Sequence, residues 1–376
     1  MLPANSSVSG RLADTLTGLF DRVIQPAHEG AKLNKVGVLV VDGLGADLVK
    51  KYSGHARFLR TRLEDYGHLA SSGLPSTTAS ALTSITTGVE SGQHGLLGYQ
   101  VRDPDTLQMV NHLKPFPDSV DPMVWQPVPT VFERAAASSI PSIAVGESRF
   151  SGTDFSQAML RGASYRGSAQ LDDHLGHLRE FFDSHDEAVA YLYWPALDRI
   201  GHGLGVNHGN FVDALEHLDA FASLLHRSLG PGEAIVVTAD HGMVDVEPHN
   251  QVWMESNHPL RSAISDWGGE PRLVQLYLHD DVDVTAYVIE LQQFLGVMAT
   301  AISRDDAIDR GLFGVVADHH RQRLGDVIVF AEESYALYDQ LTASDASSKM
   351  VGQHGSWTET ETTVPVVPLG EAFEKN

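Results

Sequence analysis

Side chains that can bind a metal ion or attack phosphorus occur at five places in this 376-residue chain, each where an apolar run ends or a turn begins. They are Asp42, Thr77, Thr78, Asp198, His202, Asp240, His241 and His354. Counting one threonine hydroxyl, the set offers three carboxylates, three imidazoles and a nucleophile. These are the groups that metal-assisted phosphoryl transfer requires.

The acidic residues follow apolar runs. Asp42 comes after VGVLVV, and Asp240-His241 comes after AIVVTA. A single Asp at such a place is also a common helix cap. A charged pair directly after a fully apolar run is harder to explain structurally, and Gly242 allows the turn that two adjacent ligands need.

Asp198 and His202 follow YLYWPA and are four residues apart. In a helix this spacing puts both on one face, where they can bind one ion, although surface Asp/His pairs at this spacing are common. His354, in GQHGSW, is an exposed loop histidine unless the other groups surround it.

Thr77 and Thr78 open TTASALTSITTG, which predicts a helix starting just after Pro75. The start of a helix offers free N–H groups to a phosphate. A threonine hydroxyl becomes a useful nucleophile only beside a base or a metal ion. The structural alternative for either residue is a capping threonine.

Composition narrows the classes of function and of metal. The formal net charge of −23 disfavours binding to nucleic-acid polymers or anionic membranes. Cysteine is absent, so Asp, His and Thr ligands favour two Zn²⁺, with Mn²⁺, Fe or Co as competitors. No apolar run approaches the roughly 20 residues of a membrane span, and no secretory signal is visible, so we expect a cytoplasmic protein.

The elements that position these groups alternate along the chain. Strands are expected at Lys35–Val41, Ser142–Val145, Ala188–Tyr193, Ala234–Thr238, Leu273–Leu278 and Asp326–Phe330. Helices are expected at Gly10–Val23, Thr130–Ala137, Gln170–Ser184, Asn210–Ser228 and Val284–Phe294. This alternation predicts an α/β fold with a mostly parallel central sheet and helices on both faces. Ligands in such sheets bind at the carboxyl ends of the strands.

Two segments lie outside this pattern. Residues 258–323 contain none of the candidate ligands and are expected to form a small inserted subdomain beside the site of a single catalytic domain spanning residues 1–376. Residues 101–129, rich in Pro and Asp, are expected to form a long loop that walls the site.

The order of these motifs resembles that of the alkaline phosphatase superfamily, and most of all its type I phosphodiesterase / nucleotide pyrophosphatase branch. The resemblance runs from about Val36 to Pro368 and includes VVDG, a Pro-Ser-x-Thr turn, HGLLGY, D-x-x-x-H, TADHGM and a late HGS. Each motif is weak alone, but their order is specific.

The resemblance implies a role for each residue. Asp42, Asp240, His241 and the nucleophile would hold one zinc ion, and Asp198, His202 and His354 would hold the other. The family's nucleophile stands ten residues before the glycine that ends its helix, here Gly88, and this selects Thr78. A covalent phospho-threonine, hydrolysed by water, is then expected.

The resemblance leaves the small phosphorylated substrate open. Ala79 and Ala81 stand where nucleotide pyrophosphatases often have an aromatic residue and an Asn, which disfavours a nucleotide. Tyr99 and Arg272 are assigned to substrate binding, with Arg102 and Arg149 as other candidate phosphate clamps. Alternatives to a phosphodiesterase are a phosphomonoesterase, a phosphonate hydrolase, a phosphoryl-group transferase and a non-catalytic metal- or phosphate-binding relative.

Overall fold

The computed structural model describes residues 8–25 and 32–374. Its larger sheet has the strand order β1-β3-β18-β9-β2-β8-β6-β7. The strands are β1 (Val8–Arg11), β2 (Lys35–Val41), β3 (His68–Ser71), β6 (Ser142–Gly146), β7 (Ser164–Gly167), β8 (Ala188–Trp194), β9 (Glu233–Thr238) and β18 (Thr363–Leu369). All pairs are parallel except those of β18, which runs antiparallel to β3 and β9. The predicted fold class is confirmed.

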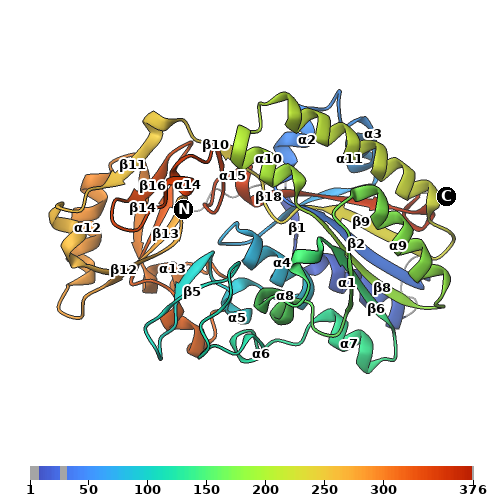
Figure 1. Cartoon of the computed structure of the whole chain (residues 1–376), viewed down its shortest axis with the longest axis horizontal. Coiled ribbons are helices and arrows are strands. Elements are labelled where there is room, and N and C mark those ends of the chain that lie inside the picture. Colours follow the sequence, from blue (N-terminus) through green and yellow to red (C-terminus); the bar gives the residue numbers. More distant parts are fainter. Residues whose placement is uncertain (1–7, 26–31, 375–376) are drawn as a thin grey trace.

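The central strands are apolar on both faces because helices cover both. Every residue of β2 after Lys35 is buried, as is every residue of β6 and β9. Figure 1 shows α2 (Ala46–Lys51), α3 (Arg57–Tyr66), α10 (Ala196–Leu204) and α11 (Gly209–Ser228) on one side of the sheet. On the other side it shows α1 (Asp14–Ile24), α4 (Thr78–Thr87), α7 (Val131–Ala137) and α8 (Asp154–Met159). Helix α9 (Leu171–Asp183) packs against β8 and β6.

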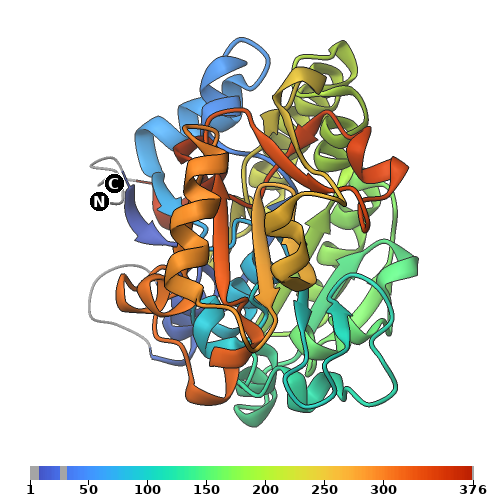
Figure 2. The same cartoon turned by 90° about the vertical axis from the view of Figure 1, so that its left-hand side faces the viewer.

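A second, antiparallel sheet stands beside the first in the order β12-β13-β15-β14. Its strands are β12 (Ile264–Glu270), β13 (Leu273–Leu278), β14 (Ala299–Ser303) and β15 (Val327–Ala331). Helix α12 (Val284–Leu295) packs on it through Tyr287, Leu291 and Leu295. Figures 1 and 2 show this sheet and α12 together at one end of the molecule. Most of the sheet comes from residues 258–323, but β15 lies just beyond them.

Short elements connect these layers. They are β4 (Gln100–Arg102), β5 (Met109–Asn111), β10 (Val244–Asp245), β11 (Gln251–Met254), β16 (Ala336–Asp339), β17 (Gly352–Gln353), α5 (Ser91–His94), α6 (Pro122–Trp125), α13 (Arg304–Asp309), α14 (Asp345–Ser348) and α15 (Glu359–Thr362). The 3₁₀ turns are η1 (Ser148–Phe150), η2 (Pro248–Asn250), η3 (Pro259–Ala263), η4 (Asp318–Arg323) and η5 (Glu371–Phe373).

Two predictions of local structure need correction. The expected helix at Gly10–Val23 begins only at Asp14, because Val8–Arg11 pairs with β3 as an edge strand. The expected loop over residues 101–129 contains the hairpin of β4 and β5 and the short helix α6. Within the described ranges, no helix has the length and apolar character to cross a bilayer.

Candidate active site

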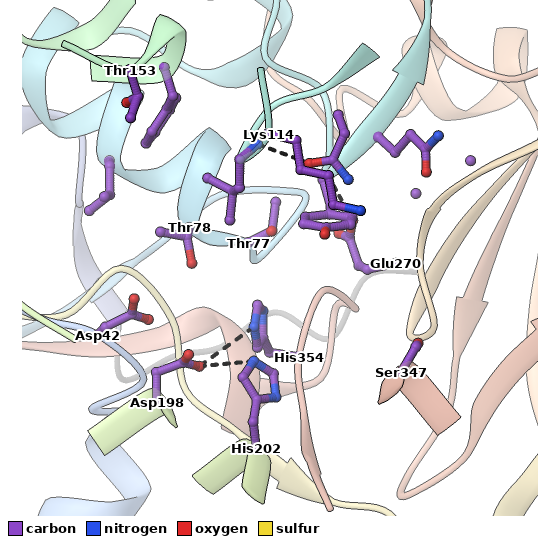
Figure 3. A pocket seen from close by; sticks show the side chains of 18 of the residues that line it. Asp42, Thr77, Thr78, Lys114, Thr153, Asp198, His202, Glu270, Ser347 and His354 are labelled. Atoms are coloured by element: carbon purple, nitrogen blue, oxygen red, sulfur yellow. Dashed lines mark hydrogen bonds and ion pairs between the residues drawn. The ribbon is translucent and has the colours of Figure 1, made fainter. Parts of the chain in front are cut away.

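The candidate ligands meet at the carboxyl edge of three adjacent strands, β9, β2 and β8. Asp42 directly follows β2, and Asp240-His241 lies just beyond β9. Asp198 and His202 lie on α10, which follows β8, and His354 follows β17. Figure 3 shows Asp42, Asp198, His202 and His354 facing one another below Thr78. The structure therefore brings together all the ligands that the sequence singled out.

Each imidazole directs Nε2 at a carboxylate. Nε2 of His241 lies 3.4 Å from Oδ1 of Asp42 and 3.4 Å from Oδ2 of Asp240. Nε2 of His202 lies 3.2 Å from Oδ1 of Asp198, and Nε2 of His354 lies 3.8 Å from the same oxygen. The rings of His241 and His354 are stacked, with their centroids 3.6 Å apart.

The opposite nitrogen of each ring faces a backbone carbonyl. Nδ1 of His202 lies 2.7 Å from the carbonyl oxygen of Gly352. Nδ1 of His241 lies 3.1 Å from that of Gly242, and Nδ1 of His354 lies 3.0 Å from that of Ser76. A carbonyl can only accept, so Nδ1 carries a proton, and in the neutral ring Nε2 presents a lone pair. A lone pair that faces carboxylate oxygens fits a metal cation between them.

The carboxylates also lack partners for some of their oxygens. Among the described residues, Asp42 Oδ1, Asp198 Oδ1 and Asp240 Oδ2 are buried oxygens without a hydrogen-bond donor. Burial, with the nearby carboxylates of Asp198 and Asp240, raises the pKa of Asp42, and burial also raises the pKa of Asp198. Buried carboxylates without compensating charge are costly, and bound divalent cations would compensate them. The donor set therefore fits metal ions.

Potential ligand atoms lie within 4.8 Å of one another in two groups, Asp42-Asp240-His241 and Asp198-His241-His354. The family resemblance assigns the ligands to the two ions slightly differently, because it gives His241 to the first ion alone and adds His202 to the second. In the structure His241 belongs to both groups and His202 joins the second through Asp198.

The candidate nucleophile stands at the mouth of this cluster. Thr78 is the first residue of α4, and its Oγ1 lies 3.2 Å from Nε2 of His241. Thr77 precedes the helix and also lines the cavity, but no side-chain cap hydrogen bond holds the helix end. The first N–H groups of a helix lack intrahelical partners, so those at the start of α4 are available to a phosphoryl group bound there.

Tyr193 was missed by the sequence analysis. Its hydroxyl donates a hydrogen bond to Oδ2 of Asp42 and so directs Oδ1 toward His241. The signal available in the sequence was a hydroxyl-bearing residue near the end of the otherwise apolar run AVAYLYW, but its partner becomes visible only in three dimensions.

The predicted clamp Arg272 lies elsewhere. Its side chain is fully buried and forms a two-pronged ion pair with Glu361, with Nε and Nη2 each 2.7 Å from a carboxylate oxygen. Its third nitrogen donates to the Tyr335 carbonyl. Arg272 thus has a structural partner rather than an open face for substrate. Arg102 is likewise held, by Ser265 and Asp266.

Glu270 lies where Arg272 was expected to act. It is 8% exposed, lines the cavity and accepts a hydrogen bond from the N–H of Tyr99 at 2.9 Å. Its other oxygen, Oε1, has no hydrogen-bond donor among the described residues. Burial raises the pKa of Glu270 to about 8, and the Glu361 carboxylate adds to the rise. Tyr99 also lines the cavity, as its assignment requires.

The site opens into a cavity of about 1040 Å³. Figure 3 shows Thr78 and His354 between Thr153 on one side and Ser347 on the other. Apolar and aromatic side chains line the Thr153 side, among them Phe150, Phe155 and Met159. The basic lining residues Lys114, Arg149, Arg199 and Arg261 come from different segments, and of these the sequence analysis had named only Arg149.

Residues 36–357 match the profile of the family described as Type I phosphodiesterase / nucleotide pyrophosphatase. The chain belongs to this family. Its members are metal-dependent hydrolases of phosphoric esters, and the family is part of the alkaline phosphatase superfamily. The chain is thus a metal-dependent hydrolase of phosphoric esters, of the phosphodiesterase / pyrophosphatase type. No curated protein matches its sequence.

Solved structures share the fold at low identity. Murine ectonucleotide pyrophosphatase / phosphodiesterase 5, as an inactive form in complex with AMP, is 15% identical, with a TM-score of 0.68 over 90% of this chain and 88% of that one. The human protein of that name is 17% identical, with a TM-score of 0.68 and the same coverage. Phosphonoacetate hydrolase from Sinorhizobium meliloti, in complex with phosphonoformate, is 20% identical, with a TM-score of 0.67 over 93% of both chains.

Proposed function

We propose that this protein is a phosphodiesterase that uses two zinc ions and a covalent intermediate on Thr78. The observation that carries the proposal is the cluster of three carboxylates and three Nε2 atoms, with the Thr78 hydroxyl 3.2 Å from Nε2 of His241. Asp42, Asp240, His241 and Thr78 would hold one ion, and Asp198, His202 and His354 the other. When bound, such ions neutralise charge on the phosphoryl oxygens and favour ionisation of the coordinated hydroxyl.

The reaction then has two steps, and both take place at Thr78. Thr78 Oγ1 gives up its proton and forms a bond to phosphorus while the bond from phosphorus to the leaving oxygen breaks, and the leaving oxygen takes up a proton. A water molecule then gives up a proton and forms a bond to phosphorus while the bond to Thr78 Oγ1 breaks, and Oγ1 takes up a proton to become the hydroxyl again. The free N–H groups at the start of α4 bind the phosphoryl oxygens in both steps.

The cavity supports a diester rather than a monoester. A diester has an organic group on each side of phosphorus, and the site lies between two parts of one large cavity. A monoester dianion needs a further cation close to phosphorus, usually an arginine. Arg272 is committed to Glu361 and does not line the cavity, so it cannot meet a second negative charge on the reacting phosphate.

The deciding experiment compares zinc-loaded enzyme on bis-p-nitrophenyl phosphate and p-nitrophenyl phosphate. We expect a higher kcat/KM for the diester, and EDTA should abolish both activities. A higher kcat/KM for the monoester would reassign the protein as a monoesterase. Mn²⁺ restoring more activity than Zn²⁺ after EDTA treatment would correct the choice of metal.

Phosphonate hydrolysis is the second candidate function. The fold likeness to phosphonoacetate hydrolase over 93% of both chains supports it. The size of the cavity opposes it, since about 1040 Å³ far exceeds the volume of a small phosphonate. Phosphate release from phosphonoacetate, measured beside the two esters, separates the candidates.

A further inference from the structure

A buried carboxylate holds two arginines at the rim of the cavity. Glu147 follows β6 and is only 7% exposed. Its Oε2 accepts a hydrogen bond from Nε of Arg149 at 2.7 Å, and its Oε1 lies 2.5 Å from Nη2 of Arg199. The two arginines come from different elements, η1 and α10, so one carboxylate fixes both guanidinium groups at the same place.

The pair is continuous with the candidate active site. Arg199 directly follows Asp198, and its charge lowers the pKa of that carboxyl, although burial outweighs this effect. The Arg149 guanidinium lies 4.7 Å from the ring centre of Phe150, and the ring centres of Phe150 and Tyr193 are 5.8 Å apart. Tyr193 in turn binds Asp42. Both arginines line the same cavity as Thr78.

The arrangement leaves positive charge and donors unused. Two guanidinium groups share one carboxylate, which leaves one positive charge in a protein whose formal net charge is −23. A guanidinium has five N–H donors, and among the described residues each of these side chains has a hydrogen bond or ion pair only to Glu147. The side chains are 59% and 50% exposed, so the remaining donors are accessible.

Apart from Glu147, nearby acidic groups in the described part of the chain form no ion pair with these arginines. Asp154 lines the same cavity and its Oδ2 accepts the N–H of Phe116, but among the described residues no ion pair joins it to Arg149 or Arg199. Asp198 belongs to the proposed metal site. Two guanidinium groups held in place by a buried carboxylate lose little freedom on binding an anion, and their geometry suits carboxylate and phosphate oxygens.

We propose that Arg149 and Arg199 form a subsite for a second anionic group of the substrate, a carboxylate or phosphate several bonds from the reacting phosphorus. The inference rests on the proposed function, because it takes the reacting phosphorus to lie at Thr78. It narrows the substrate class to phosphoesters or phosphoanhydrides with a further negative charge on one of their organic groups. Phe150 packs against that part of the substrate.

The test uses inhibitors that share one phosphonate and differ at the far end. Propylphosphonate ends in a methyl group, phosphonopropionate in a carboxylate and propylene diphosphonate in a second phosphonate. Inhibition constants are measured on the zinc-loaded enzyme with whichever ester it hydrolyses, so failure of the diesterase proposal would not affect this comparison. We expect at least one inhibitor with a second anionic group to bind about tenfold more tightly than propylphosphonate, since charge-assisted bonds give that order of gain.

Substitutions assign the preference to the pair. Arg149→Met and Arg199→Met should each reduce the ratio of inhibition constants several-fold, and the double variant should bring it near one. Arg149→Lys and Arg199→Lys keep the charge but lose the planar donors, so they should give intermediate ratios. Arg60→Met, an exposed arginine paired with Glu64, is the matched control and should keep the wild-type ratio.

Three results would overturn the inference. The first is equal inhibition by all three compounds in the wild-type enzyme. The second is a preference for the inhibitors with a second anionic group that persists in both the Met and the Lys variants. The third is a preference that Arg60→Met weakens as much as Arg149→Met does, since this would show a general effect of surface charge. Whether phosphonopropionate or the diphosphonate binds more tightly tells whether the second group is a carboxylate or a phosphate.

Discussion

The hydroxyl of Thr78 lies 3.2 Å from Nε2 of His241, the ring shared by both groups of potential metal ligands. Because Nδ1 of His241 faces the Gly242 carbonyl, Nε2 is the nitrogen that presents a lone pair toward Thr78. A metal ion bound at Nε2 would therefore be near the threonine oxygen as well. Thr77, one residue earlier, lies outside the first turn of α4.

Thr78→Ala is expected to lower kcat by about a thousandfold or more, as loss of a covalent nucleophile does. Metal content should fall less, because the carboxylates and imidazoles remain. Thr78→Ser keeps a hydroxyl and should retain part of the activity. Steady-state kinetics with metal analysis on the same preparations checks this.

Thr77→Ala is the matched control for the nucleophile. It removes the neighbouring hydroxyl and leaves the Thr78–His241 contact in place, so its effect on kcat should be much milder. If Thr77→Ala were the more damaging change, the nucleophile would be Thr77, and the position ten residues before Gly88 would have selected the wrong threonine.

Metal binding is expected to stabilise the fold. Purified protein should carry up to two zinc-type ions per chain, and EDTA should lower Tm because it leaves buried carboxylates uncompensated. Asp240→Asn, which alters a fully buried side chain, should lower the metal content and Tm. Elemental analysis and thermal unfolding measure both.

Asp172→Asn provides the comparison for Asp240→Asn. Its carboxylate is 74% exposed and pairs with His217 at the surface. Metal content and Tm should match those of the wild type. Equal metal content in Asp240→Asn and wild-type protein would remove Asp240 from the set of ligands.

Local patterns in the sequence were sufficient to predict which candidate ligands share one edge of the sheet. Apolar runs such as VGVLVV form strands buried on both faces, which put Asp42 and Asp240 at the carboxyl edge, and the structure adds that β2 and β9 are neighbours. The four-residue spacing of Asp198 and His202 was also informative, because α10 puts the two side chains on one face. Periodicity and strand ends are local properties, and here they sufficed.

Long-range partners could not be predicted. Arg272 pairs with Glu361, 89 residues away, and nothing near Arg272 in sequence indicates a fully buried arginine. The N-terminal segment reads as the start of an amphipathic helix, but pairing with β3 makes Val8–Arg11 a strand. Tyr193 and Glu270 belong to the site because of neighbours that only the fold supplies.

The Arg272–Glu361 pair is expected to stabilise the fold rather than select the substrate. Arg272→Ala leaves Glu361 buried without a partner, which costs about 3–5 kcal/mol of unfolding free energy. Activity toward diesters and monoesters should fall together, in proportion to the folded fraction. Urea unfolding and parallel assays on both esters test this.

Arg60→Ala is the exposed counterpart for this pair. Arg60 and Glu64 lie one helical turn apart at the surface, so the loss should stay within about 1 kcal/mol. A folded Arg272→Ala variant with a selective loss of monoester hydrolysis would instead restore Arg272 as the phosphate clamp.

Glu270 is expected to make the metal-free protein less stable as pH rises. In the folded protein its pKa is raised to about 8, while the ordinary value is 4.5. Between these values the folded state keeps a proton that the unfolded chain has lost, so the free energy of unfolding falls with rising pH. The raised pKa values of Asp42 and Asp198 act in the same direction.

Glu270→Gln isolates the contribution of this one carboxyl. The amide cannot ionise, so the variant should lose less stability than the wild type between about pH 5 and pH 8, by a few kcal/mol. Urea unfolding of EDTA-treated protein at several pH values gives the two slopes. Glu64→Gln, at a 58% exposed side chain, should follow the wild type. Identical slopes for Glu270→Gln and wild-type protein would mean that Glu270 is already ionised in the folded state, with its free oxygen satisfied by water from the cavity.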